Sequence, residues 1–386
     1  MKTLIDVVNF NADASCLSSS AWHEALRGGA DSDVCRWLMA AVDTGRKLSL
    51  GLTGATVADL VHANPEAVSV IRDHRDIFEL LVRPFAHDVA LLRSPGGFRY
   101  NLALGQRVLG HTFGDDITPA YLPPEFMLTN EQLGLLAEAG ILATFINRSR
   151  FRSDLAANIP ETPYVVEGLF GAALPCLPLS GALTHAQRDA LHEFTAAPWN
   201  EAIARTETDL VASWRDGESA FFLPDGVDRE RAWLEHEAGA RRCHVRDVMG
   251  ELVDAQHRAG YPLHAVGDWM KELRMLGYLR RIERLEDRWV ELSHDQRILW
   301  LSAIGSDVLS AVEKEPPQIE YRQTGDGPLE GLCLQRSARG LEGEEALVWA
   351  ERLFDRQQEF AFDAWLAGDA PHLFKLRARR KVAIQS

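Results

Sequence analysis

The stretch Ala120–Ile141, AYLPPEFMLTNEQLGLLAEAGI, decides the fold class because it joins a short strand to a helix through two prolines. The prolines fix φ and favour extended backbone before them, so the pattern predicts that the strand ends there. Thr129 or Asn130 can then cap a helix whose apolar positions recur at helical spacing. Glu125 follows the strand directly, at the edge of a β/α architecture where reacting side chains gather.

Glu125 has two interpretations at this position. A carboxylate on a stiff backbone can serve as a nucleophile. It can equally be an ordinary acid at the start of a helix, where the helix dipole favours negative charge. The rest of the chain has to separate the two.

Strand-like runs alternate with amphipathic segments over residues 1–257. The runs are TLIDVVNF, KLSLGL, FELLV, AYL, ILATFIN, a strand pair in PYVVEGLFGAALPCLPLS, and TDLVASW. Helical patterns lie between them, including one on each side of Pro65. This alternation predicts an α/β fold with a mainly parallel sheet or barrel.

The pattern changes from about residue 258. Three long segments there place apolar residues at helical spacing, for example AVGDWMKELRMLGYL. The Pro- and Gly-containing stretch EPPQIEYRQTGDGPLEG between them predicts a loop. We therefore expect two units, a β/α unit over residues 1–257 and a helical C-terminal region over residues 258–386.

Composition and charge narrow the function. The 386 residues are 46% hydrophobic and 25% charged, as in folded globular proteins, and the net charge is −15. Nucleic-acid phosphates would be repelled by that charge, so we expect no nucleic-acid partner. No apolar run reaches the roughly 18 residues of a membrane helix, and the N-terminus lacks a signal-peptide pattern. The five cysteines are scattered without metal or redox spacing. These features predict a cytoplasmic protein without a membrane partner.

Polar side chains follow several of the predicted strands. These are Asn11, Asp13, His87, Glu125 and Asp216. Because the ends of parallel strands share one face, we expect these groups to converge in a pocket. Two carboxylates on such a face suit glycosidic cleavage, in which one attacks the anomeric carbon and the other protonates the leaving oxygen.

We assign the nucleophile to Glu125 and the acid/base to Asp216. Trp214 offers a flat apolar face to a sugar ring. The predicted substrate-binding set is Asn11, Asp13, His87, Asp116 and Trp214. Four of the predicted site residues also have a structural alternative: Asp216 as a turn residue, His87 as a hydrogen-bonded core histidine, Asp13 as a helix cap and Asp116 as a loop acid.

These residues resemble a known family. The block PAYLPPEFMLTNEQLGLLAEAGI is similar to the nucleophile region of family 57 glycoside hydrolases, where a Pro-Glu pair ends a strand. FELLVRPFAHDVALL resembles an upstream block with a histidine after a strand, and DGES after LVASW resembles the strand that carries the acid/base aspartate. The resemblance spans about residues 3–250. It implies a distorted (β/α)7 barrel and retaining chemistry on α-linked glucans or related sugars, without a metal or other cofactor.

The sequence departs from the family pattern in three places. NFNADAS stands where the family has His-Gln-Pro, with Asn11 in the place of the histidine. Leu122 replaces the aromatic residue before the Pro-Glu pair, and DGESAFF lacks the Gly-His pair. These departures bear on the substrate and on the activity.

Two other readings remain open. Related barrels of the polysaccharide deacetylase type hold a divalent cation with one aspartate and two histidines, and Asp13, His87 and His111 supply that set of residue types. The two histidines are far apart in the chain, whereas such ligands usually come from one His-x-x-x-His segment. The third reading is a non-catalytic or repurposed sugar-binding barrel.

Overall fold

The structure is a computed structural model. The residues that it describes are 2–11, 19–148, 159–193, 195–222, 225–236, 240–253, 255, 258–260, 286, 319–322 and 333–336. None of the described helices combines the length and apolarity of a transmembrane span.

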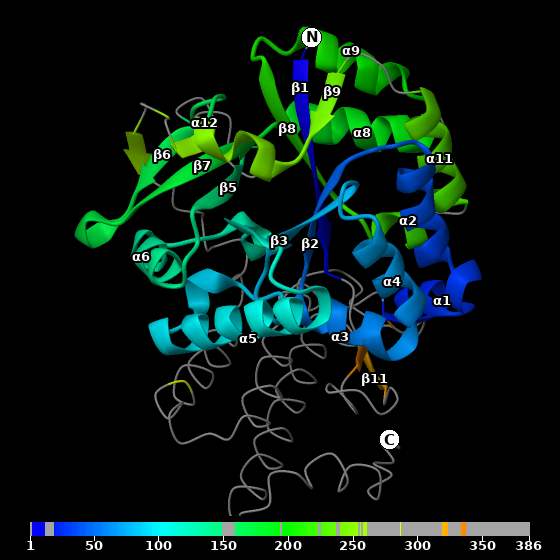
Figure 1. Cartoon of the computed structure of the whole chain (residues 1–386), viewed down its shortest axis with the longest axis horizontal. Coiled ribbons are helices and arrows are strands. Elements are labelled where there is room, and N and C mark those ends of the chain that lie inside the picture. Colours follow the sequence, from blue (N-terminus) through cyan, green and yellow to red (C-terminus); the bar gives the residue numbers. More distant parts are fainter. Residues whose placement is uncertain are drawn as a thin grey trace, which may run out of the picture.

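Parallel strands form the centre of the fold (Figure 1). Their spatial order is β8-β1-β2-β3-β4-β5-β7, and each pairs in parallel with its neighbour. The bounds are β1 (Lys2–Phe10), β2 (Leu48–Leu52), β3 (Phe78–Val82), β4 (Thr118–Tyr121), β5 (Ala143–Asn147), β7 (Ala173–Leu179) and β8 (Leu210–Asp216). All carboxyl ends therefore lie at one edge, which confirms the predicted α/β class.

The remaining strands extend this sheet. β6 (Tyr164–Glu167) pairs antiparallel with β7, as the strand-pair pattern predicted, and β10 (Arg258–Gly260) pairs with β6. β9 (Ala240–Cys243) lies along the first half of β1. At the far end, the backbone N–H of Ser180 donates to the carbonyl of Ala212 in β8 at 2.8 Å. This bond links the segment after β7 to β8 and gives the sheet a barrel-like form.

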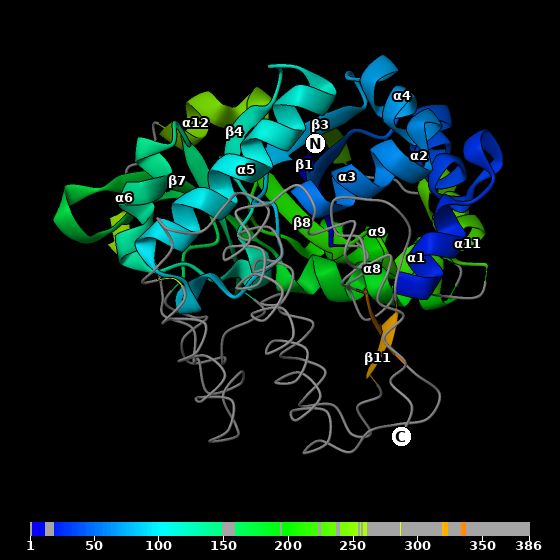
Figure 2. The same cartoon turned by 90° about the horizontal axis from the view of Figure 1, so that it is seen from below.

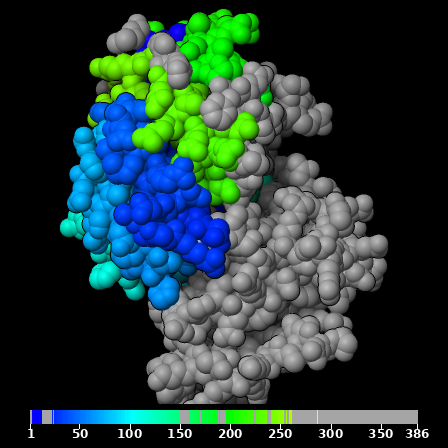
Figure 3. Space-filling model, turned by 90° about the vertical axis from the view of Figure 1, so that its right-hand side faces the viewer, coloured from blue at the N-terminus to red at the C-terminus, as the bar shows by residue number. Residues whose placement is uncertain are grey.

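Helices flank the strands on both sides (Figure 2). They are α1 (Ser19–Leu26), α2 (Asp33–Asp43), α3 (Gly54–Ala63), α4 (Pro65–Asp73), α5 (Pro95–Phe113), α6 (Asn130–Glu138), α8 (Gly181–Glu193), α9 (Ala197–Arg205), α10 (Ser219–Phe222), α11 (Gly226–His236) and α12 (Met249–Val253). α11 and α2, distant in sequence, lie side by side (yellow-green and blue in Figure 3). Arg36 on α2 pairs with Asp228 on α11 at 2.8 Å.

Side-chain caps fix where several helices begin. Ser32, Thr53, Asn64 and Ser94 each accept a backbone N–H from the first turn of α2, α3, α4 and α5. At α6 the cap is Thr129, which forms a reciprocal capping box with Gln132. Of the two caps predicted for this helix, Thr129 or Asn130, it is Thr129 that caps it.

Strand side chains alternate between an interior and an outer layer. Ile5 and Val7 of β1 belong to the interior cluster with residues of β3, β4, β5, β7 and β8. Val8 and Phe10 belong instead to the outer cluster beneath α1 to α4. This alternation decides which strand-end residues face the interior.

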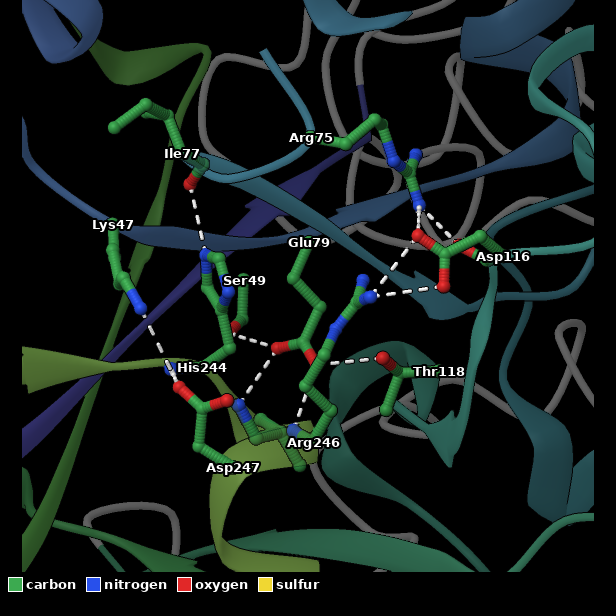
Figure 4. Close-up of polar contacts among 11 residues, drawn as sticks. Lys47, Ser49, Arg75, Ile77, Glu79, Asp116, Thr118, His244, Arg246 and Asp247 are labelled. Atoms are coloured by element: carbon green, nitrogen blue, oxygen red, sulfur yellow. Dashed lines mark hydrogen bonds and ion pairs between the residues drawn. The ribbon is translucent and has the colours of Figure 1, made fainter.

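A buried carboxylate closes the interior at the amino ends of the strands (Figure 4). Glu79 of β3 is fully buried and accepts hydrogen bonds from the hydroxyls of Ser49 and Thr118. It also accepts the backbone N–H groups of Val245 and Arg246, at 2.7 and 2.8 Å. The Nε of Arg246 donates to Oε1 as well, at 3.4 Å. These donors satisfy the buried carboxyl group and fasten the segment after β9 under the sheet.

A second buried carboxylate lies on the outer face of β1. Asp6 is fully buried, and Arg46 donates to its Oδ2 through Nε at 3.1 Å and Nη2 at 2.7 Å. Burial alone would raise the pKa of Asp6, but the charges of Arg46, Arg215 and Arg242 outweigh it and lower that pKa to about 2. Asp6 is therefore ionised at neutral pH and ties β1 to the arginines around it.

The predicted helical region over residues 258–386 lies outside the described residues, except for a few short pieces. Residues 258–260 form β10 within the main sheet, so the predicted boundary at residue 257 cuts through the β/α unit. β11 (Ile319–Arg322), within the predicted loop EPPQIEYRQTGDGPLEG, pairs antiparallel with β12 (Cys333–Arg336), which follows that loop. The loop prediction is therefore wrong for Ile319–Arg322, where Ile and Tyr have high strand propensity.

Replacing Asp6 by Asn is expected to lower the free energy of unfolding by about 3–5 kcal/mol at pH 7, because it removes the negative charge that faces the buried guanidinium of Arg46. The lowered pKa gives Asp6 a stabilising contribution that is complete above the unfolded value of 3.8 and is lost as the pH falls through about 2. The difference in the free energy of unfolding between wild type and Asp6→Asn should therefore decrease as the pH falls from 3.8 to about 2. Urea unfolding at pH 7 and pH 3 measures it.

The matched control is Asp33→Asn. Asp33 pairs with Arg36 at 3.0 Å, but both side chains are about half exposed, so a loss of at most about 1 kcal/mol is expected. Equal losses in the two variants at pH 7 would contradict the role given to Asp6.

Candidate active site

Polar side chains gather at the carboxyl edge of the parallel strands. Their positions continue the interior-facing side of each strand, and most of them are buried. They are Asn9 at the end of β1, Arg83 after β3, Asn147 at the end of β5 and Asp216 at the end of β8. Glu125 joins them from the turn after β4. The edge thus combines carboxylates, amides and one guanidinium.

Glu125 lies on a strained turn. Its φ is 50° and that of Phe126 is 54°, in the left-handed region that residues with a side chain rarely adopt. The turn is closed by hydrogen bonds from the N–H of Phe126 to the carbonyl of Pro123, at 3.1 Å, and from the N–H of Met127 to that of Pro124, at 3.0 Å. Strain of this kind clusters at functional sites. It also shows that Glu125 does not simply begin a helix, because α6 starts at Asn130.

A chain of contacts runs from Arg83 to Glu125. Nη2 of Arg83 lies 2.7 Å from Nδ1 of His87, and Nε2 of His87 lies 3.1 Å from Oε1 of Glu125. Nη1 of Arg83 donates to the carbonyl of Leu122 at 2.9 Å. The side chains of His87 and Glu125 are 6% and 13% exposed, so this chain is largely shielded from water.

Burial and the neighbouring charges shift the pKa values of His87 and Arg83. Burial lowers the pKa of His87, and the nearby charge of Arg83 lowers it further, against the opposing hydrogen bond and charge of Glu125. His87 is therefore neutral at pH 7, and its contact with Glu125 is a hydrogen bond, not an ion pair. Burial lowers the pKa of Arg83 to about 10, so Arg83 stays cationic.

Asp216 belongs to the same site. Nδ2 of Asn9, its neighbour in the β1–β8 register, donates to Oδ1 of Asp216 at 2.7 Å. The negative charges of Asp216, Glu125 and Glu218 all raise the pKa of Arg83, and those of Asp216 and Glu125 both raise that of His87. The two predicted catalytic carboxylates therefore act on the same buried groups.

Trp214 and Asn11 support this edge in different ways. Trp214 packs edge-on against Phe126, with ring centroids 4.9 Å apart, and is only 8% exposed. It therefore supports the turn of Glu125 from inside the fold. The backbone N–H of Asn11 lies 3.4 Å from Oε2 of Glu218, next to Asp216 in β8.

The structure does not bring Asp116 to this edge. Asp116 precedes β4 and lies at the amino ends of the strands, where it pairs with Arg246 and Arg75 (Figure 4). Its side chain is 63% exposed. Asp116 precedes its strand. The expectation that an acid after a strand lies at the carboxyl edge therefore does not apply to it.

The two histidines of the metal-site reading do not come together. Asp13 lies outside the described residues. His111 is exposed in the last turn of α5, while His87 is buried against Glu125. In the part of the chain that the structure describes, no group of three His, Cys, Asp or Glu side chains is arranged to hold a metal ion.

Sequence reasoning missed Arg83, Asn9, Asn147 and Glu218. Asn9 and Asn147 are the polar interior residues nearest the ends of β1 and β5, and Arg83 follows β3 directly. The strand-end pattern that found Glu125 therefore contained a signal for them too. A cavity of about 650 Å³ lies between α8, α9 and the β7–β8 seam. None of the site residues lines it, although Arg148, which follows Asn147, does.

Comparisons with known proteins agree on the fold. The chain superimposes on a family 57-type branching enzyme from Pyrococcus horikoshii with a TM-score of 0.68 and 11% identity, over 98% of this chain and 94% of that one. For the α-amylase AmyC from Thermotoga maritima the TM-score is 0.61 and the identity 9%, over 98% and 96%. For the 4-α-glucanotransferase from Thermococcus litoralis they are 0.58 and 11%, over 80% of this chain and 56% of that enzyme.

These likenesses define the class. The chain has the fold of the family 57 glycoside hydrolases, as its sequence blocks predicted. It spans little more than half the length of the glucanotransferase. No protein-family model matches the sequence, and no curated protein matches it.

Gly51→Ala is expected to disturb the site. A Cβ at Gly51 would lie 2.4 Å from Cδ2 of Leu122, so the Leu122 side chain would have to move, and it would touch Cδ of Arg83 at 3.4 Å. Overpacking of this kind costs about 1–3 kcal/mol. Thermal unfolding and the binding or turnover of a glycoside measure the two effects.

The control is Gly110→Ala in α5, where nothing lies within 4 Å of the added Cβ. That substitution is expected to stabilise the fold by up to about 1 kcal/mol, because alanine favours helix over glycine. A Gly51→Ala variant as stable as this control would show that the packing around Arg83 and Leu122 is loose.

Proposed function

We propose that the chain is a retaining glycoside hydrolase or glycosyl-transfer enzyme that acts on α-linked glucan-like or related sugars. The observation that carries the proposal is the turn of Glu125: a largely buried carboxylate on left-handed backbone, hydrogen-bonded to a neutral histidine, at the strand edge that also holds Asp216. The solved structures with this fold, named as a branching enzyme, an α-amylase and a glucanotransferase, support the substrate class.

In this reaction Glu125 attacks the anomeric carbon and forms a covalent glycosyl-enzyme, while Asp216 gives its proton to the leaving oxygen. Asp216 then takes a proton from the incoming hydroxyl, which attacks the glycosyl-enzyme and releases Glu125. Water as the acceptor gives hydrolysis, and a sugar hydroxyl gives transfer. The site serves both, since they share the covalent intermediate.

The environment of Glu125 fits a nucleophile. The carboxylate has to be ionised, and the neutral donor His87 together with the cation Arg83 favours the ionised form. Positive charge develops on the sugar ring in the transition state, where the carboxylates Glu125 and Glu218 stabilise it. No step of this chemistry requires a metal ion.

Glu125→Gln is expected to lower turnover of an activated α-glycosyl fluoride by at least roughly 10³-fold, because the amide cannot attack the anomeric carbon. Stability should change by less than about 1 kcal/mol, since the amide oxygen still accepts from His87. Intact mass after incubation with a panel of α-glycosyl fluorides should show a sugar adduct on wild type and none on the variant.

Glu138→Gln is the matched control: Glu138 lies on the exposed face of α6, where it pairs with Arg99 at 2.8 Å, and the variant should form the adduct like wild type. A further test is Glu125→Ala with azide, which should give a glycosyl azide of inverted anomeric configuration because azide enters the space of the nucleophile. An adduct on the Glu125→Gln protein would refute the assignment.

Asp216→Asn is expected to slow substrates with poor leaving groups by roughly 10²- to 10⁴-fold, since these depend on proton donation, and to slow glycosyl fluorides much less. Steady-state rates across a series of aryl glycosides of rising leaving-group pKa measure the difference. Asp116→Asn, the same substitution at the opposite end of the strands, should leave every rate unchanged. Equal slowing for good and poor leaving groups would assign the acid to another residue.

A further inference from the structure

Arg83 is the most enclosed charged residue at the candidate active site. Arg83 directly follows β3 on its interior-facing side, and it is only 1% exposed. Each of its two terminal nitrogens has a defined partner, Nδ1 of His87 and the carbonyl of Leu122. Nothing in the retaining reaction itself calls for a guanidinium at this place.

The Arg83–His87 contact fixes where the imidazole carries its proton. A guanidinium has only donors, so Nδ1 of His87 must be the acceptor at 2.7 Å. In the neutral ring the single proton then lies on Nε2. Because Nε2 is 3.1 Å from Oε1 of Glu125, His87 donates to the carboxylate.

The second contact of Arg83 holds the backbone that carries Glu125. Leu122 immediately precedes the two prolines, and its carbonyl accepts from Nη1 of Arg83 at 2.9 Å. The strained φ values of Glu125 and Phe126 follow within four residues. Arg83 therefore acts on Glu125 by two routes, through the imidazole and through the turn.

The surroundings of Arg83 are built to keep it still. Gly51 leaves the space that the Leu122 and Arg83 side chains fill. Gly105 of α5 lets that helix approach the carbonyl of Arg83, where a Cβ would lie at 2.2 Å. The carbonyls of Pro84 and Phe85 accept the N–H groups of Gly54 and Ala55 at the start of α3. The segment that carries Arg83 is thus fixed by two helices.

We propose that Arg83 is a positioning residue that holds His87 as the Nε2–H tautomer and thereby orients the carboxylate of Glu125. This inference rests on the proposed function only for its catalytic consequence, because the tautomer exists in the free protein. Arg83 does not contact the sugar in this account. It acts through His87 and through the carbonyl of Leu122.

The first test is ¹⁵N NMR of protein labelled at histidine, without substrate, at pH 7. Of the 13 histidines, His87 is identified by the signals that vanish in His87→Gln. We expect a neutral ring with the proton on Nε2 in wild type, and a mixture of tautomers in Arg83→Met. A wild-type His87 with its proton on Nδ1, or with both nitrogens protonated, would overturn the proposal, and this outcome does not require Arg83→Met to fold.

The second test is kinetic. Arg83→Met is expected to lower kcat roughly 10- to 100-fold, with a smaller change in KM, because a misplaced nucleophile loses rate more than binding. Arg83→Lys keeps the positive charge but lacks the planar guanidinium with its two terminal donors, so it should restore little of the lost kcat. His87→Gln retains a donor near Nε2, and adding Arg83→Met to it should cost several-fold less than Arg83→Met does alone.

The two proposals fail separately. If no glycosyl donor labels Glu125 while the NMR shows the Nε2–H tautomer and its loss in Arg83→Met, the proposed function fails and the positioning role stands. If wild type is labelled but Arg83→Met retains both the tautomer and the wild-type rate, the role of Arg83 fails and the proposed function stands.

Discussion

The left-handed backbone at Glu125 and Phe126 is the constraint on which the rest of the site depends. Such φ values cost roughly 1–3 kcal/mol each and persist only where the surroundings over-determine them. Here Arg83 binds the carbonyl before the turn, the prolines close it, and Trp214 packs on the ring of Phe126. A carboxylate that only began a helix would need none of this support.

The interior of the fold is polar at both ends, but the two ends differ in how their carboxylates are satisfied. At the amino end, Glu79 is fully buried and receives backbone N–H groups and hydroxyls, which fasten one segment to the sheet. At the carboxyl end, Glu125 is partly exposed and meets a histidine, a titratable group held neutral by burial. Saturated, static hydrogen bonding is typical of structure, whereas partly open groups of shifted pKa are typical of function.

Much of this arrangement followed from the sequence. Alternating strand and helix patterns predicted parallel strands, and parallel strands place their ends together, so Glu125, His87 and Asp216 were expected at one edge. The prediction for Asp116 used its residue type without its place relative to the strand, and Asp116 lies at the other end. Arg83 also follows a strand, but an arginine before a proline gives no local sign that it is buried. Its role depends on Gly51 and Leu122, which are distant in sequence and meet it only in the folded chain.

The structure shows which polar side chain stands at the end of β1, where the sequence departs from the family pattern. The polar interior residue of β1 nearest the site is Asn9, and its amide donates to Asp216. An amide does not titrate, so the donor at Asp216 keeps the same charge at every pH, where a histidine would change. His87 is the other neutral donor, and it donates to Glu125. Each carboxylate thus has an uncharged donor of its own, while Arg83 supplies the buried positive charge on which Glu125, Asp216 and Glu218 all act. With those carboxylates around one cation, the edge favours positive charge on whatever binds there, as a sugar ring acquires when its glycosidic bond breaks.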